Sequence, residues 1–395
     1  MNTTHKISIV AAAAALCAGS AFAAEIGGIE FRGYSRGGPV LSYPDNIKGG
    51  LSLGGDLQKY RLGNEGDNGI EIDLIKNFEA GGLKWKVHYM PAKWGSGAIG
   101  TNQAYVEMSG LPFAPEGKFW AGQRRLRLQD VHIVDNFVMN YGENQGAGVT
   151  DIKIGGAKLG VGVFTGDTFD TALPANVKAT RVNVDISDIQ TNPGGKLRVL
   201  LTAVNGSGLA GGNTGSGLSV SHNQADFLVK GLSNTLFLQT SSGHARIDGQ
   251  FQSIDGVTAG KKVTRIADSL NWQMGAFGGQ ALLSYQTNKD DVTGVTTKDT
   301  SIGGRVSYAF SPNFKLLAEA GSTSRKAPGR DQTLNKITIA PTLSVGPDFW
   351  SRPELRFYVT KANWNTAAAL ANASSFGAGG RTSATLAGVQ YEIWW

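Results

Sequence analysis

The chain has 395 residues, of which 41% are hydrophobic, 17% are charged and 55 are glycine. A disordered chain needs high net charge and few apolar residues, so this composition excludes one. No run of about 18 apolar residues occurs, which excludes a transmembrane helix.

Residues 1–24 are predicted to be a signal peptide. They carry Lys6, an apolar stretch over 9–18 and an Ala-x-Ala pattern at 21–23, the order typical of exported proteins. The single cysteine, Cys17, lies in this segment, so the mature chain is expected to have no disulfide and no Cys-ligated metal. We expect no cofactor. The net charge of +6 is scattered and the chain is exported, so we predict no nucleic-acid partner.

From residue 29 to the end of the chain, apolar residues alternate with polar ones. Ile70, Ile72 and Leu74 alternate with Glu71 and Asp73. The same period of two recurs over 84–89, 181–186, 197–201, 305–310, 355–360 and 388–395. This period predicts β-strands with one apolar and one polar face.

The links between these strands fall into two classes that alternate along the chain. Eight short, turn-rich links lie at 79–82, 111–117, 155–157, 192–195, 231–234, 275–279, 311–313 and 346–353. Nine long, polar, glycine-rich links lie at 37–58, 91–101, 127–148, 166–177, 206–221, 242–260, 288–300, 322–332 and 365–381. Short turns on one side and long loops on the other are typical of outer-membrane barrels.

We therefore predict an all-β fold: residues 25–395 form one transmembrane antiparallel β-barrel of 18 strands, with short periplasmic turns and long external loops. Sixteen strands is the alternative if one hairpin is miscounted. A soluble β-sandwich or β-helix would also alternate, but it does not explain a final alternating strand that ends in Trp395. Such a terminal aromatic resembles the signal of bacterial outer-membrane barrels.

Alternation also assigns side chains to the inside of the barrel. In the first strand Arg32, Tyr34 and Arg36 share a charged face, which must be the lumen. In the last strand Glu392 and Trp394 take the lumen face. Lumenal aromatics among charges suit sugar rings, which stack apolar C–H faces and offer hydroxyls to ionic groups. Packing of these aromatics under an infolded loop is an equally compatible interpretation.

Eight segments stand out along the chain, at 31–37, 59–65, 120–124, 130–135, 146–148, 192–195, 350–353 and 391–395. In their order and spacing they resemble the maltoporin family of trimeric, 18-stranded, maltodextrin-selective porins. The resemblance implies a third loop, about 127–148, folded into the barrel. It also implies a homotrimer embedded in outer-membrane lipid.

The resemblance further implies a path of aromatic side chains for the sugar. By position, the path consists of Tyr34, Trp94, Trp350, Trp394 and one further position. This position falls at Leu236 or Phe237, because a one-residue insertion after Ser233 shifts the register, and we favour Phe237. Trp94, in the second long link, corresponds to a tryptophan that a neighbouring subunit lends to the channel mouth. Gly69 stands where the family has another path tyrosine.

A polar track and a constriction are implied beside this path. They consist of Arg36, Arg61, Glu71, Arg127, Asp130, Asp135 and Phe137. Phe137 replaces a family tyrosine, and Leu128 and Asn102 replace family arginines. The constriction is thus expected to lose one hydroxyl and some basic groups.

The predicted function is passive, sugar-selective transport across the bacterial outer membrane, with maltose, maltodextrins or related oligosaccharides as substrates. The first alternative is a general diffusion or weakly anion-preferring porin. A lumenal hydrolase is the alternative from another class, but the chain contains no Gly-x-Ser-x-Gly motif. We predict that the protein is not an enzyme.

Overall fold

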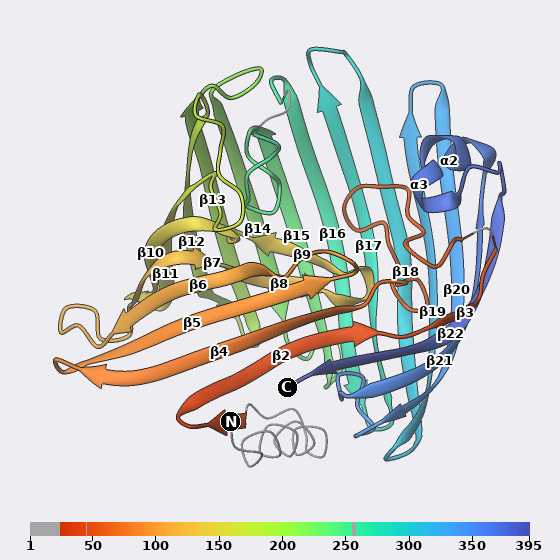
Figure 1. Cartoon of the computed structure of the whole chain (residues 1–395), viewed down its shortest axis with the longest axis horizontal. Helices are drawn as coiled ribbons and strands as arrows, with labels where there is room; N and C mark the ends of the chain where they lie inside the picture. The colour runs from red at the N-terminus through yellow and green to blue at the C-terminus, as the bar shows by residue number, and fades with distance from the viewer. Residues whose placement is uncertain (1–23, 45, 255–257) are drawn as a thin grey trace, which may run out of the picture.

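Eighteen antiparallel strands form a closed barrel in the computed structural model (Figure 1). Each strand pairs with the next along the chain, and the last pairs with the first through Tyr34 opposite Trp394. The predicted barrel of 18 strands is therefore confirmed, and the alternative of 16 is wrong. The structure describes residues 24–44, 46–254 and 258–395, so nearly all of the expected signal peptide lies outside the described residues.

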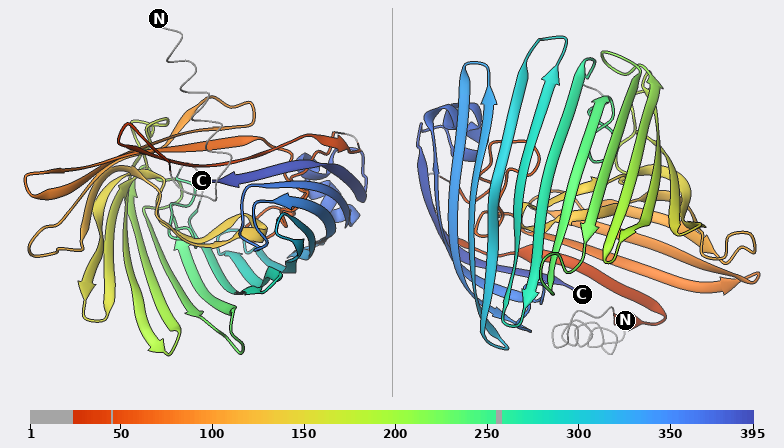
Figure 2. Two further views of the ribbon diagram at one scale, coloured as in Figure 1. Left: turned by 90° about the horizontal axis from the view of Figure 1, so that it is seen from below. Right: turned by 180° about the vertical axis from the view of Figure 1, so that it is seen from behind.

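The 18 strands wind around the barrel, as Figure 2 shows from two further sides. They are β2 (Ile29–Gly37), β4 (Gly69–Ala80), β5 (Leu83–Trp94), β6 (Gly100–Ser109), β7 (Lys118–Arg124), β10 (Asn144–Ile154), β11 (Ala157–Thr165), β12 (Lys178–Asn192), β13 (Gly195–Ser207), β14 (Thr214–Gln224), β15 (Leu232–Gly243), β16 (Lys261–Met274), β17 (Phe277–Asp290), β18 (Thr296–Ser311), β19 (Phe314–Ala327), β20 (Arg330–Ser344), β21 (Glu354–Trp364) and β22 (Ser383–Trp394). The remaining elements are β1 (Ala24–Ile26), β3 (Val40–Ser42), β8 (Arg127–Val131), η1 (His132–Val134), β9 (Asn136–Asn140), α2 (Thr366–Ala371) and α3 (Ala373–Phe376). Within the described ranges, no helix has the length and apolarity needed to cross a membrane.

The barrel wall is apolar outside and polar inside. On β20, Ile337 and Ile339 are 55% and 51% exposed, whereas Lys336 and Thr338 beside them are buried. Soluble proteins bury their apolar side chains instead. The pattern fits a barrel whose outer surface faces lipid.

All eight short links correspond to connections between consecutive strands, although the one predicted at 231–234 lies at 225–231, and several long links are shorter than expected. Strands β19 and β20 are joined by residues 328–329 alone, and β17 and β18 by residues 291–295. The polar stretches at 322–332 and 288–300 mostly continue the strands. The reason is that a strand exposed to water on both faces loses its apolar pattern while keeping its backbone ladder.

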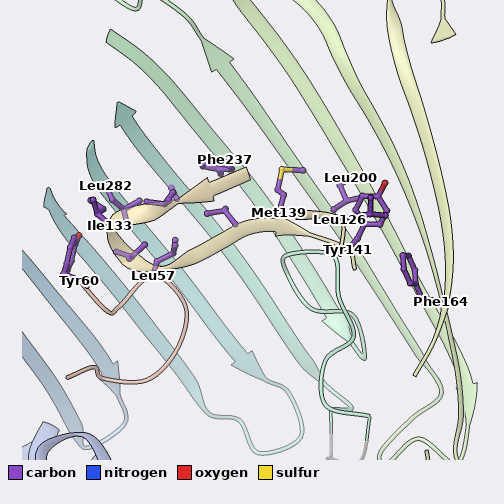
Figure 3. Close-up of a cluster of buried hydrophobic side chains, with 14 of the residues drawn as sticks. Leu57, Tyr60, Leu126, Ile133, Met139, Tyr141, Phe164, Leu200, Phe237 and Leu282 are labelled. Atoms are coloured by element: carbon purple, nitrogen blue, oxygen red, sulfur yellow. The ribbon is translucent and has the colours of Figure 1, made fainter. Parts of the chain in front are cut away.

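An inner hairpin, made of β8, η1 and β9, crosses the interior between β7 and β10 (Figures 1 and 3). The Ile133 amide donates a hydrogen bond to Gln280 Oε1 on β17 (3.0 Å), and Gln239 Nε2 on β15 donates to the Val138 carbonyl (2.9 Å). Apolar side chains of the hairpin face the same wall and bury Val131, Ile133, Val134, Val138, Met139, Phe237, Ala267 and Leu282 in one cluster. Its other face carries the polar residues and is left for the lumen.

The segment 46–68, here called the first loop, fills another part of the interior. The Leu62 amide donates to Glu319 Oε1 (2.9 Å), and Lys336 Nζ donates to the Leu62 carbonyl (2.6 Å). The Tyr60 ring lies against Gly321, where a Cβ would come closer than 3.0 Å to it. A second apolar cluster joins this loop to α2, α3 and the wall through Ile47, Leu51, Leu53, Trp364, Ala368 and Phe376. The inner hairpin and the first loop therefore narrow the lumen.

Candidate functional site: a lumenal cavity lined by aromatic and charged side chains

A cavity of about 640 Å³ lies between the inner hairpin, the first loop and the wall. This is within the range of about 300–1,000 Å³ typical of small-ligand sites. Eleven of the twelve predicted site residues line it: Tyr34, Arg36, Arg61, Glu71, Trp94, Arg127, Asp130, Asp135, Phe137, Trp350 and Trp394. The structure also brings Asp67, Arg125 and His132 to its wall.

Phe237 does not join this group. Its side chain points inward from β15, but it is only 1% exposed and lies in the apolar cluster beneath the inner hairpin (Figure 3). The inner hairpin covers this position, so an inward direction on the strand does not bring the ring to the cavity.

The tyrosine and the tryptophans of the cavity come from β2, from the ends of β5 and β22 and from the turn between β20 and β21. Trp94 is the last residue of β5, directly before the connection to β6. Its ring stacks on that of Tyr34, with the two ring centroids 6.2 Å apart. Tyr34 is paired with Trp394 on β22, and Trp350 lies in the turn between β20 and β21. The sequence placed Trp94 in a loop. The structure places it in a strand, with its ring in the lumen of its own chain.

The buried carboxylate of Glu392 contacts the hydroxyl of Tyr34 and three arginines. Glu392 Oε1 accepts a hydrogen bond from the Tyr34 hydroxyl (2.9 Å) and lies 2.9 Å from Arg61 Nη2. Its other oxygen contacts Arg352 Nε (2.8 Å) and Arg356 Nη2. The Glu392 side chain is fully buried. These ionic contacts fix the direction of the Tyr34 and Arg61 side chains.

Arg36 connects the aromatic residues to the polar groups of the cavity. Its guanidinium lies 2.7 Å from Glu65, 2.9 Å from Asp135 and 3.0 Å from Asp67. It also lies 4.8 Å from the centroid of the Trp94 ring. Because the Arg36 cation faces three carboxylates and a π-system, its side chain is held in place without a ligand.

A second ionic group surrounds Glu71. Arg125 Nη1 lies 2.8 Å from Glu71 Oε1, and Asn102 Nδ2 donates to the same oxygen (2.9 Å). The Arg127 guanidinium lies 4.3 Å from the centroid of the Phe137 ring. The sequence indicates that bases are missing at 102 and 128, but the predicted site does not include Arg125. The run of bases at 124, 125 and 127, just before the inner hairpin, was the available signal.

His132 is buried at the meeting point of the ionic and aromatic groups. Its ring centroid lies 5.2 Å from that of Trp350 and 5.9 Å from that of Trp394. Its Nδ1 is 3.2 Å from Arg61 Nη1, and its Nε2 is 3.6 Å from Glu392. No spacing in the sequence indicates that His132 contacts these residues, because each of them is distant along the chain.

Comparison with known families gives one match over nearly the whole barrel, from residue 29 to residue 395, to LamB porin. The chain belongs to the LamB porin family. The resemblance stated from the sequence is thus confirmed, and a porin of this family with a closed barrel is an outer-membrane transport channel.

Relatives of this LamB-family porin cover its full length at low identity. A maltoporin of Vibrio cholerae serotype O1 is 28% identical over 446 residues, covering 100% of this chain and 99% of the relative. A maltoporin of Hahella chejuensis is 27% identical over 435 residues, with 100% and 99% covered. Among solved structures, Pseudomonas aeruginosa OccK3 aligns with a TM-score of 0.51 at 10% identity, covering 93% of this chain and 94% of that one. The likeness to OccK3 concerns the fold alone.

One acid of the porin's inner hairpin has an unusual protonation equilibrium. The Asp130 side chain is 36% exposed to the cavity, and burial of the remainder raises its pKa to about 7. Arg61 opposes this shift, and the Asp135 carboxylate adds to it. Burial lowers the pKa of His132 to about 3, so this neighbour stays neutral. Burial alone would raise the pKa of Asp135, but Arg61 and Arg36 hold it below its usual range.

We therefore expect the ion selectivity of the porin to depend on pH. Because the folded-state pKa of Asp130 is raised, a change from about pH 6 to about pH 8 deprotonates it and adds one negative charge to the cavity. The preference for cations should rise over this interval, as measured by the zero-current potential in a KCl gradient across a planar bilayer. Asp130→Asn should remove the pH step. A wild-type potential that is constant over this interval would contradict the assignment.

Proposed function

We propose that this porin is a passive, sugar-selective channel that conducts maltose, maltodextrins or related oligosaccharides across the outer membrane. The observation that carries the proposal is that the rings of Trp94, Tyr34, Trp394 and Trp350 line one cavity, where Trp94 stacks on Tyr34 and Tyr34 is paired with Trp394. Aromatic faces offer flat apolar surfaces to the C–H faces of sugar rings. Arg36, Asp135 and the other charged groups of the cavity supply donors and acceptors for the hydroxyls.

The charges of the cavity favour a neutral polar substrate. Its lining contains four arginines and four acidic residues: Arg36, Arg61, Arg125, Arg127, Asp67, Glu71, Asp130 and Asp135. Most of these groups already form ion pairs with one another, at 2.8–3.9 Å. Such a balance gives little reason for anion preference. It allows hydroxyls to exchange hydrogen bonds with successive partners, and binding stays weak enough for release.

The names of the relatives support maltodextrins as the first substrates to test, since both curated relatives given above are maltoporins. We further propose a homotrimer in the outer membrane, exported by a cleaved signal peptide over residues 1–24. Trimer formation is tested by chemical cross-linking of the protein in vesicles and by its migration on gels before and after heating.

The channel proposal is tested by single-channel conductance in a planar bilayer. The purified protein is titrated with maltose through maltohexaose, with sucrose in parallel. We expect saturable block of the ion current that becomes tighter as the maltodextrin lengthens, because a longer chain covers more of the aromatic rings. Such block would support the function and the substrate together.

Other outcomes of the same titration separate the alternatives. Saturable block by sucrose alone would keep the channel and change its substrate. Large conductance that no sugar reduces would overturn the proposal in favour of a general diffusion porin. Turnover of the oligosaccharide, measured as new reducing ends, would instead indicate a lumenal hydrolase.

A further inference from the structure

Trp94 and Gly69 face each other directly across two neighbouring strands. They are partners in the register of β4 and β5, and the ladder continues through Glu71 opposite Ala92. The backbone around Trp94 is fixed further because the Gly95 amide donates to the Asn68 carbonyl (2.8 Å). The direction of the Trp94 side chain is therefore set by the pleat of the sheet and not by a flexible loop.

The absence of a side chain at position 69 makes room for the indole. A Cβ on Gly69 would lie less than 3.0 Å from three ring atoms of Trp94. Gly69 is not at a positive φ, so the backbone does not require glycine there. The space required by the Trp94 ring is the reason that only glycine fits.

The indole uses this space to reach across β4 to β2. It stacks on Tyr34, with the two rings inclined by 30°, and it lies under the guanidinium of Arg36. Arg36 and Gly69 are themselves register partners, so Gly69 sits between Arg36 and Trp94 in the sheet. Adjacent strands are about 4.8 Å apart, so a side chain at 69 would stand between the two groups.

We propose that Gly69 and Trp94 form one functional unit within a single protomer. Gly69 is a positioning residue that lets the barrel's own Trp94 supply the loop-end ring of the sugar path. Each barrel then has a complete path without an aromatic residue from a neighbouring subunit. The inference rests on the proposed sugar channel and adds which chain provides the ring and which residue positions it.

The ladder argues against donation of Trp94 to a neighbour. Lumen-facing and lipid-facing side chains alternate along β5, and His88 and Met90 lie on the same buried face as Trp94. Turning Trp94 toward another barrel would require a one-residue slip, which would reverse every side chain of the strand. The connection to β6, residues 95–99, is too short to carry Trp94 away while the ladder stays paired.

The first experiment is a double-mutant cycle read by maltohexaose block of the channel. Gly69→Ala displaces the indole, so we expect it to weaken block about tenfold, equivalent to about 1.4 kcal/mol, and Trp94→Ala to weaken it by a similar factor. In the Trp94→Ala background, Gly69→Ala should have no further effect, because the ring it displaces is gone. Gly69→Tyr combined with Trp94→Ala should restore block, since an aromatic ring then rises from position 69 itself.

The matched control is Gly156→Ala in the turn between β10 and β11, where a Cβ meets nothing within 4 Å. Maltohexaose should block this variant as tightly as it blocks the wild type. If Gly69→Ala weakens block equally with and without Trp94, the proposed positioning role is overturned. The double variants also identify a folding defect that arises from position 69 independently of Trp94, because such a defect would persist when Trp94 is absent.

A second experiment asks which chain supplies the ring, using mixed oligomers of two variants. One chain carries Trp94→Ala and the other carries Trp394→Ala, with different affinity tags so that only mixed oligomers are recovered. If Trp94 acts within its own barrel, every channel lacks either the Trp94 ring or the Trp394 ring. Maltohexaose should then block none of these channels as tightly as the wild type. Channels with wild-type affinity would arise only if a neighbour's Trp94 completed a barrel that retained Trp394, and would overturn the proposal.

The proposed function and this inference fail in different ways. Absence of sugar block in the wild type would remove the proposed function. The position of the indole can then still be tested, because removing it should raise the KCl conductance of a single channel. If the Trp94→Ala channel folds correctly but its KCl conductance does not rise, the placement of the Trp94 ring in the lumen of its own chain is overturned.

Discussion

Replacing Glu392 by glutamine is expected to lower the free energy of unfolding of the barrel by about 3 kcal/mol. The carboxylate is fully buried and faces Arg61, Arg352 and Arg356. Glutamine keeps the shape but removes the negative charge, and three buried cations then lose their shared counterion. The remaining carboxylates at Glu65 and Glu354 compensate only in part.

The measurement is urea-induced unfolding of the protein in lipid vesicles, followed by tryptophan fluorescence. Glu30→Gln is the matched control, since Glu30 pairs with Arg32 at an exposed site on the first strand. Exposed pairs contribute about 0–1 kcal/mol, so this control should unfold nearly as the wild type does. Equal midpoints for the two variants would show that the Glu392 ion cluster does not stabilise the barrel.

Removing the two tryptophans at the turn end is expected to have the largest effect on sugar binding. Trp394→Ala and Trp350→Ala should each weaken maltohexaose block about tenfold, and the pair about a hundredfold, if the rings contact different sugar units. The loss should be smaller for maltose, which covers fewer rings at a time. The measurement is the sugar concentration that halves the single-channel current.

Phe237→Leu is the control for these tryptophans. Phe237 points inward but is covered by the inner hairpin, so a residue of similar apolar volume should leave sugar block within about twofold of the wild type. A large loss on Phe237→Leu, together with an unchanged Trp394→Ala, would place the path elsewhere in the barrel and contradict the aromatic lining described above.

Some of the site could be predicted from local pattern alone. The period of two assigned Tyr34, Glu71 and Trp394 to the lumen, and they line the cavity. This works because successive side chains of a strand must point to opposite faces, whatever the rest of the chain does. The turn signals located the 18 strands for a similar reason, since glycine, proline and asparagine act on the backbone within a few residues.

Other features depended on contacts between distant segments. The period of two predicts that the Phe237 side chain points into the barrel. Only the packing of the inner hairpin on β15 and β17 decides that its ring is covered. The environment of His132 is made by Arg61, Trp350 and Glu392, which no local spacing connects. Arg125 reaches Glu71 only because β7 ends beside the start of the inner hairpin.

The amino-acid sequence was sufficient for the closed sheet, the inward faces of its strands and the types of side chain available in the lumen, because these follow from interactions between near neighbours. The tertiary structure was needed to decide which inward side chains meet open space and which are covered. Trp94 shows the difference. Its place at the end of β5, opposite Gly69, comes from the register between strands, and that register is set by hydrogen bonds and packing over the whole barrel.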